Sequence, residues 1–218
     1  MMEKVFFEPW VGKDYLTGGI LNKRIMVLGE SLYCGGCDNC GKEMEKAEEG
    51  EGENVCWTTK KIIKRILEID KTHEGWHNTF VKFERAVLNK ELSQVEKEQF
   101  WNSILYYNYV QESMSETRTS PSCEQFKLSE IAFFEVLEKY RPQCIIVWGR
   151  RLWQNMPGGD LWNECEKIAF DWSDWSERCG EYSLKDNTKV SVMSIYHPSV
   201  GFSWESWHPF ISEFINRA

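Results

Sequence analysis

The chain lacks long hydrophobic runs, and its N-terminus lacks a targeting signal. No apolar stretch of about 18 residues is present, which a membrane-spanning helix would require. The first ten residues, MMEKVFFEPW, lack the basic, apolar and small-residue sections of a secretory signal peptide. We therefore expect a soluble, cytoplasmic protein without a membrane partner. A length of 218 residues suits one domain with a sizeable core and is short for two.

The chain also has fewer positively charged than negatively charged side chains. The chain has 26 Lys and Arg residues against 34 Asp and Glu, which gives a formal net charge of -8 at pH 7. A protein that coats DNA non-specifically neutralises phosphates with Lys and Arg, so this balance argues against that class. Part of the acidity is local, because residues 41–54 contain six Glu and two Lys. We expect this segment to be a mobile surface loop, since it has little apolar surface to bury.

The eight cysteines are spread over a chain too long for a secreted disulfide scaffold, which leaves metal binding, catalysis or core packing. Cys34, Cys37 and Cys40 follow a C-x2-C-x2-C pattern, and Cys56 lies beyond the acidic segment. Four thiolates fit a structural zinc ion or an iron-sulfur cluster. The alternative, four unligated loop cysteines, stays open. The other four show no metal spacing, and the one in an apolar run is expected in the core: Cys123, Cys144, Cys165 and Cys179.

Four short apolar segments alternate with helical patterns along the chain. Residues 24–28, 103–110, 144–148 and 190–196 have the length and composition of buried strands. Amphipathic spacing predicts helices over 58–69, 80–88, 93–101, 128–140, 150–157, 161–170 and 207–217. This alternation predicts an α/β fold, a three-layer α/β/α sandwich with a central, mainly parallel four-stranded sheet. Residues 1–23 are expected to form an irregular arm, and 1–218 a single domain.

Polar side chains stand where the predicted strands end. Glu30 follows the first strand, Asn108 lies at the end of the second, and His197 follows the fourth. In parallel sheets ligands bind beyond the carboxyl ends of the strands. A carboxylate can polarise water, an amide can bind the edge of a nucleobase, and Pro198 helps to orient the imidazole that precedes it. Each also has a structural alternative, as a cap or a loop contact.

A family resemblance follows from these residues. The loop Gly29-Glu30-x-x-Tyr33, the Asn at the end of the second strand and the Tyr-His-Pro-Ser sequence at 196–199 resemble the uracil-DNA glycosylase superfamily. The match runs from about residue 24 to the C-terminus. It implies a DNA glycosylase that cleaves the N-glycosidic bond of a flipped-out base, uracil, in single-stranded or duplex DNA. The chemistry so implied requires no cofactor.

The resemblance also implies roles for the strand-end residues. Asn108 would hydrogen-bond the base edge, and His197 would stabilise negative charge on the departing base. Glu30 would direct the attacking water. Ser31 falls where other members of the superfamily have Asp, so the placement of the water-directing group departs from part of the family pattern.

Further pocket residues are implied in the same way. Tyr33 would exclude a 5-methyl group, which favours uracil over thymine. Phe80, or failing it Trp76, would be the stacking ring, and Ser199 would belong to the base-binding set. Phe202 would be the apolar wedge that holds a duplex open, although its segment lacks the leucine usual in the family.

Two hypotheses from other functional classes remain open. A non-catalytic module using the same pocket would bind a free nucleobase or nucleotide, which agrees with the acidic charge. A metal-organised interaction protein would keep the pocket residues only as relics. The sequence makes no prediction of the oligomeric state.

Overall fold

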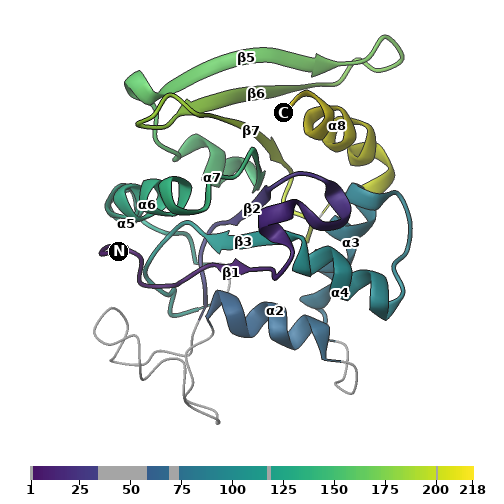
Figure 1. Ribbon diagram of the computed structural model, residues 1–218, viewed down its shortest axis with the longest axis horizontal. Coiled ribbons are helices and arrows are strands. Elements are labelled where there is room, and N and C mark those ends of the chain that lie inside the picture. Colours follow the sequence, from purple (N-terminus) through teal and green to yellow (C-terminus); the bar gives the residue numbers. More distant parts are fainter. Residues whose placement is uncertain (1, 34–57, 69–73, 117–118, 200) are drawn as a thin grey trace.

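A computed structural model describes residues 2–33, 58–68, 74–116, 119–199 and 201–218 (Figure 1). Within these ranges the chain forms a mixed α/β fold around a seven-stranded sheet of order β1-β3-β2-β4-β7-β6-β5. The predicted four-stranded sheet is therefore too small. The predicted acidic loop at 41–54, and Cys34, Cys37, Cys40 and Cys56, lie outside the described residues.

The four predicted strands form the parallel centre of the sheet. They are β2 (Ile25–Gly29), β3 (Ile104–Asn108), β4 (Cys144–Trp148) and β7 (Lys189–Ile195). Neighbours pair in parallel, with Gly29 opposite Asn108 and Trp148 opposite Ile195. The carboxyl ends of all four therefore meet at one edge, as the sequence predicted.

Three antiparallel strands extend this centre and were not predicted. β1 (Trp10–Val11) pairs with β3, so the expected N-terminal arm contributes a strand and two short 3₁₀ turns, Tyr15–Thr17 and Gly19–Leu21. At the other edge, β6 (Ser176–Ser183) pairs with β7, and β5 (Trp162–Ala169) pairs with β6. The predicted helix over 161–170 is wrong, because these residues form the 3₁₀ turn Gly159–Leu161 and the edge strand β5.

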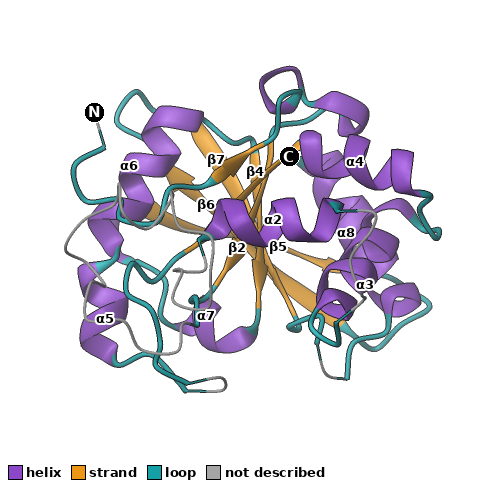
Figure 2. Ribbon diagram, turned by 90° about the horizontal axis from the view of Figure 1, so that it is seen from below, coloured by secondary structure: helices purple, strands orange, loops and turns teal. Residues whose placement is uncertain are grey.

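Helices cover both faces of the sheet (Figure 2). One face packs against α2 (Thr59–Leu67), α3 (His77–Leu88), α4 (Gln94–Asn102) and α8 (Trp204–Arg217). The other packs against α5 (Cys123–Leu128), α6 (Glu130–Tyr140) and α7 (Arg150–Gln154). In β2, Ile25 and Val27 face the first group and Met26 and Leu28 the second, which explains why this strand is continuously apolar.

Local capping confirms two predicted helix starts. The Thr58 hydroxyl accepts a hydrogen bond from the Lys61 backbone N–H at 3.3 Å, and α2 begins at the next residue. Ser93 and Glu96 form the predicted capping box at the start of α4. None of the described helices is long and apolar enough to cross a bilayer.

Candidate functional site

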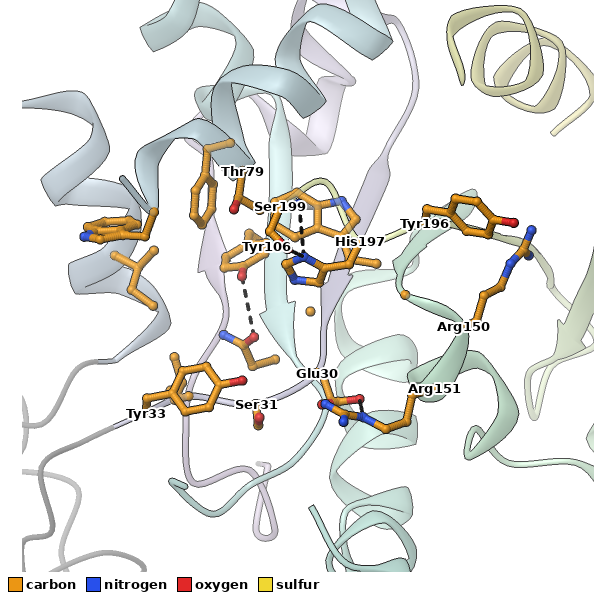
Figure 3. Close-up of a pocket in the computed structure, with 18 of the residues that line it drawn as sticks. Glu30, Ser31, Tyr33, Thr79, Tyr106, Arg150, Arg151, Tyr196, His197 and Ser199 are labelled. Carbon is orange, nitrogen blue, oxygen red and sulfur yellow. Dashed lines mark hydrogen bonds and ion pairs between the residues drawn. The ribbon is translucent and has the colours of Figure 1, made fainter. Parts of the chain in front are cut away.

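A cavity of about 870 Å³ opens at the edge where the carboxyl ends of the parallel strands meet. The cavity is lined by residues that follow β2, β4 and β7, by the end of β3 and by the first turn of α3. Figure 3 shows Tyr33, Ser31, Glu30, His197 and Tyr106 around one space, with Arg150 and Tyr196 to one side. Seven predicted site residues line this cavity: Glu30, Ser31, Tyr33, Phe80, Asn108, His197 and Ser199.

The Asn108 amide lies at the inner wall of the cavity and is only 2% exposed. Its contacts are long, because Tyr106 donates to its Oδ1 at 3.5 Å and its Nδ2 donates to the Thr59 hydroxyl at 3.5 Å. Burial raises the pKa of Tyr106, so that hydroxyl stays protonated as a donor. Contacts of this length are weak, and the amide therefore retains hydrogen-bonding capacity for a ligand.

Gly29 makes room for this amide. A Cβ atom at position 29 would lie 2.4 Å from Asn108 Oδ1 and 2.9 Å from the Tyr106 hydroxyl. Only a residue without a side chain fits between the ends of β2 and β3 at this point. The strand-ending glycine is therefore a packing requirement of the site.

His197 faces the cavity with its tautomer set by Ser199. The Ser199 backbone N–H donates to His197 Nδ1 at 3.3 Å, and the Ser199 hydroxyl lies 2.8 Å from the same nitrogen. Because Nδ1 accepts, the neutral ring carries its proton on Nε2. The ring is open to the cavity, yet the surrounding protein desolvates it and lowers its pKa below 6.5, an effect that Arg151 reinforces and Glu30 opposes. The imidazole is therefore neutral at pH 7.

Glu30 is held by an arginine that the sequence analysis did not select. Arg151 Nε donates to Glu30 Oε2 at 2.8 Å and its Nη2 donates to Glu30 Oε1, so the pair is bidentate (Figure 3). Arg151 Nη1 donates to the Ser120 hydroxyl. The carboxylate raises the pKa of Arg151 through these hydrogen bonds. Two consecutive arginines after a strand-ending glycine were the only available signal for this contact.

Aromatic rings form another wall. Phe80 is buried and packs edge-to-face against Trp148 and Tyr106, with ring centroids 5.3 and 5.7 Å away. Trp76, the alternative stacking residue, also lines the cavity, and its ring centroid lies 5.8 Å from that of Phe80. Tyr33 is exposed, and its backbone bridges to Met114. These rings provide an apolar surface beside the polar groups of Asn108 and His197.

Arg150, beside Arg151, forms an ion pair with a buried carboxylate. Its guanidinium pairs with Glu177 of β6, which is 1% exposed, and donates to the Ser194 hydroxyl at 2.6 Å. It also lies over the Tyr196 ring, 5.1 Å from the centroid. Arg150 therefore ties the antiparallel edge of the sheet to the cavity.

Phe202 does not line the cavity. It is 7% exposed and stacks on Trp207 of α8, with ring centroids 5.9 Å apart and planes 5° from parallel. A wedge must be free to enter between base pairs, and this ring is held in the core. In this structure Phe202 therefore packs in the core, and its role as a wedge stays a prediction.

The cysteines in the described part of the chain lie in the core, on paired strands or at the surface. Cys144 is fully buried in β4, as predicted. Cys165 and Cys179 face each other across β5 and β6, and the exposed Cys123 does not line the cavity. Among the residues with described positions, no group of three or more His, Cys, Asp or Glu is placed to hold a metal ion. The four cysteines predicted to bind a metal lie outside the residues that the structure describes, so that prediction stays open.

Comparisons with known proteins match this chain to no family model and to no curated protein. The case for a function thus depends on the cavity itself. The cavity combines a buried amide, a neutral imidazole with a defined tautomer, a carboxylate held by an arginine, and an aromatic wall. Such a lining suits a ligand with a flat ring that carries hydrogen-bonding groups.

Proposed function

We propose that the protein is a DNA glycosylase-like hydrolase that removes a flipped-out base, with uracil as the expected base. The observation that carries this proposal is that Glu30, Asn108 and His197, from three separate strand ends, line one cavity. Helices on both faces of the sheet agree with the three-layer α/β/α architecture that the proposed family requires. The cavity is large enough for a nucleobase with part of its sugar.

Base recognition would depend on Asn108 and the aromatic wall. The amide supplies an acceptor and donors in one plane, which matches the N3–H and O4 edge of uracil. Phe80 or Trp76 would pack against the base, and Tyr33 would stand where a 5-substituent would extend. The long existing contacts of Asn108 support this role, since the ligand would replace weak bonds with stronger ones.

Bond cleavage would depend on His197 and Glu30. As the bond to the sugar breaks, negative charge develops on the base, and the Nε2–H of a neutral imidazole would donate a hydrogen bond to it. The sugar develops oxocarbenium character, which the Glu30 carboxylate would stabilise while it orients the attacking water. The lowered pKa of His197 supports a neutral donor over an imidazolium.

The test uses single-stranded and duplex oligonucleotides that contain one uracil, followed by alkaline cleavage of abasic sites. We expect excision by the wild type, and losses of about 100- to 1,000-fold in kcat for Glu30→Gln and for His197→Ala. The Lys189→Met variant, at an exposed position outside the cavity, serves as the control. Absence of abasic product from uracil and other modified bases would contradict the enzyme proposal; retained nucleobase binding would then favour the non-catalytic module.

A structural zinc ion or iron-sulfur cluster held by Cys34, Cys37, Cys40 and Cys56 is a separate proposal. Metal analysis and an absorption spectrum of protein prepared without chelators test it directly. One zinc ion per chain, or a brown protein with bound iron, is expected if the four thiolates act together. Metal-free protein that remains folded would contradict it.

A further inference from the structure

Arg151 connects three loops at the edge of the sheet that carries the cavity. Its own position follows β4 at the start of α7, Glu30 follows β2, and Ser120 lies in the segment between β3 and α5. The guanidinium donates to both carboxylate oxygens of Glu30 and, with its remaining terminal nitrogen, to the Ser120 hydroxyl. One side chain thus links the segments that follow three parallel strands.

The geometry of this contact differs from that of an ordinary surface ion pair. The Glu30 side chain is 12% exposed, whereas that of Arg151 is 47% exposed, so the carboxylate lies inward and the guanidinium covers it from the solvent side. A planar guanidinium bound to both oxygens fixes the plane of the carboxylate as well as its position. An ammonium group, which acts as a point charge, would not fix that plane.

We propose that Arg151 is a positioning residue, which acts through Glu30 by holding its carboxylate in one orientation inside the cavity. This inference rests on the proposed function, and it adds a residue to the site. An ionised carboxylate has about four acceptor positions, and the fork of Arg151 occupies one on each oxygen. Glu30 therefore keeps acceptor positions for a water molecule while its orientation stays fixed.

A second consequence concerns His197. The cation of Arg151 and the anion of Glu30 act on the imidazole in opposite directions. With Arg151 in place the two charges oppose each other, and desolvation, the largest effect, keeps the ring neutral. Removal of the cation would leave the carboxylate acting alone on His197.

The kinetic test is a double-mutant cycle with Arg151→Met and Glu30→Gln. We expect Arg151→Met to lower kcat for uracil excision by about 10- to 100-fold with little change in KM, because the carboxylate loses its orientation. In the Glu30→Gln background the same substitution should cost less than about threefold. Arg151→Lys keeps the charge without the fork, and it should lose most of the same activity. Equal losses in both backgrounds would overturn the proposal.

The second readout needs no activity. NMR titration of His197, assigned with a His197→Gln variant, should show a higher pKa in Arg151→Met than in the wild type. Arg151→Lys should lie close to the wild type, since it keeps the positive charge. An unchanged His197 pKa in Arg151→Met would overturn the proposal, whether or not the protein excises uracil. An inactive wild type with the expected pKa changes would count against the glycosylase proposal alone.

Arg217→Met is the matched control. Arg217 also pairs with a glutamate, Glu213, and is of similar exposure, but it does not line the cavity. Its replacement should change neither the excision rate nor the pKa of His197. Thermal unfolding of each variant separates loss of orientation from loss of fold. A Glu30-dependent loss of kcat in Arg151→Met protein that unfolds near the wild-type temperature supports the proposal.

Discussion

At the scale of one residue, protonation of His197 should determine how kcat for excision falls at acidic pH. Its pKa in the folded protein lies below 6.5, because desolvation penalises the imidazolium. The neutral donor is therefore present at pH 7 and is lost as the pH falls through this lowered value. We expect kcat for excision to be constant near neutrality and to fall with a midpoint below pH 6.5. A midpoint above pH 6.5 that tracks the NMR titration of His197 would contradict this assignment.

The same shift links His197 to stability. Between its pKa in the folded chain and the higher value in the unfolded chain, the unfolded chain binds more protons. The free energy of unfolding should therefore decrease as the pH falls below about 6.5. The His197→Gln variant should lose this part of the pH dependence.

Gly29→Ala tests the packing of the site. The new methyl group would lie 2.4 Å from Asn108 Oδ1, so the amide must move or the strand ends must separate. We expect a loss of about 1–3 kcal/mol in the free energy of unfolding, together with weaker nucleobase binding. Gly158→Ala is the control, because no atom lies within 4 Å of a Cβ at that position and the residue does not line the cavity. Chemical denaturation and ligand titration measure the two effects, and unchanged binding in Gly29→Ala would contradict the packing role.

The cavity-lining positions of Glu30, Asn108 and His197 could be predicted because each follows from where a strand ends. Parallel strands place their carboxyl ends at one edge, and the chain order of the strands was visible in the sequence. Arg151 could not be predicted in the same way. Its partners are 121 and 31 residues away in the chain, and only the folded loops bring them together.

At the scale of elements, the β5–β6 hairpin shows where sequence patterns failed. β5 is an edge strand with only Ile168 buried, so most of its residues face solvent and no alternation marks it as a strand. In β6 a buried position is occupied by Glu177, which is acceptable only because Arg150 pairs with it. A charged residue at a buried position interrupts the apolar alternation that marks a strand, and the arginine that pairs with it lies on α7.

Glu177 also provides a test at this scale, since it joins β6 to α7. Its carboxylate pairs with Arg150 and accepts a hydrogen bond from Trp175 Nε1. Glu177→Ala removes both contacts, although Arg150 is 34% exposed and can be partly rehydrated. We expect a loss of about 1–3 kcal/mol in the free energy of unfolding.

Glu181→Ala is the matched control for this substitution. Glu181 is on the same strand and pairs with the exposed Lys189, so its loss should stay within about 0.5 kcal/mol. Chemical denaturation of the two variants gives the comparison. Equal effects would mean that the Arg150 pair adds nothing beyond a surface ion pair.

At the scale of the whole molecule, net charge and the position of Phe202 bear on the substrate. The chain carries a net charge of -8, and Phe202 is packed against Trp207. We expect faster excision from single-stranded than from duplex DNA, because the predicted wedge is not free and opening a duplex costs energy. The ratio of the two rates measures this directly.

Phe202→Ala distinguishes packing from wedge function. A core role predicts a loss of about 3–5 kcal/mol in stability, and equal changes in the excision rates on the two substrates at a temperature where the variant is folded. A selective loss on duplex DNA would restore the wedge. Leu128→Ala, at a residue that is 70% exposed, controls for the loss of an apolar side chain.

The strand order also determines when the site can exist. β2 lies between β3 and β4, so Glu30 meets its neighbours only after segments about 80 and 120 residues away have paired with it. His197 arrives with β7, near the end of the chain. A nascent chain that has emerged only as far as α7 contains Glu30, Asn108 and Arg151 but lacks the imidazole of His197. Ligand binding that needs His197 should therefore begin only after β7 has paired with β4, and recovery of such binding would report completion of the central sheet during refolding.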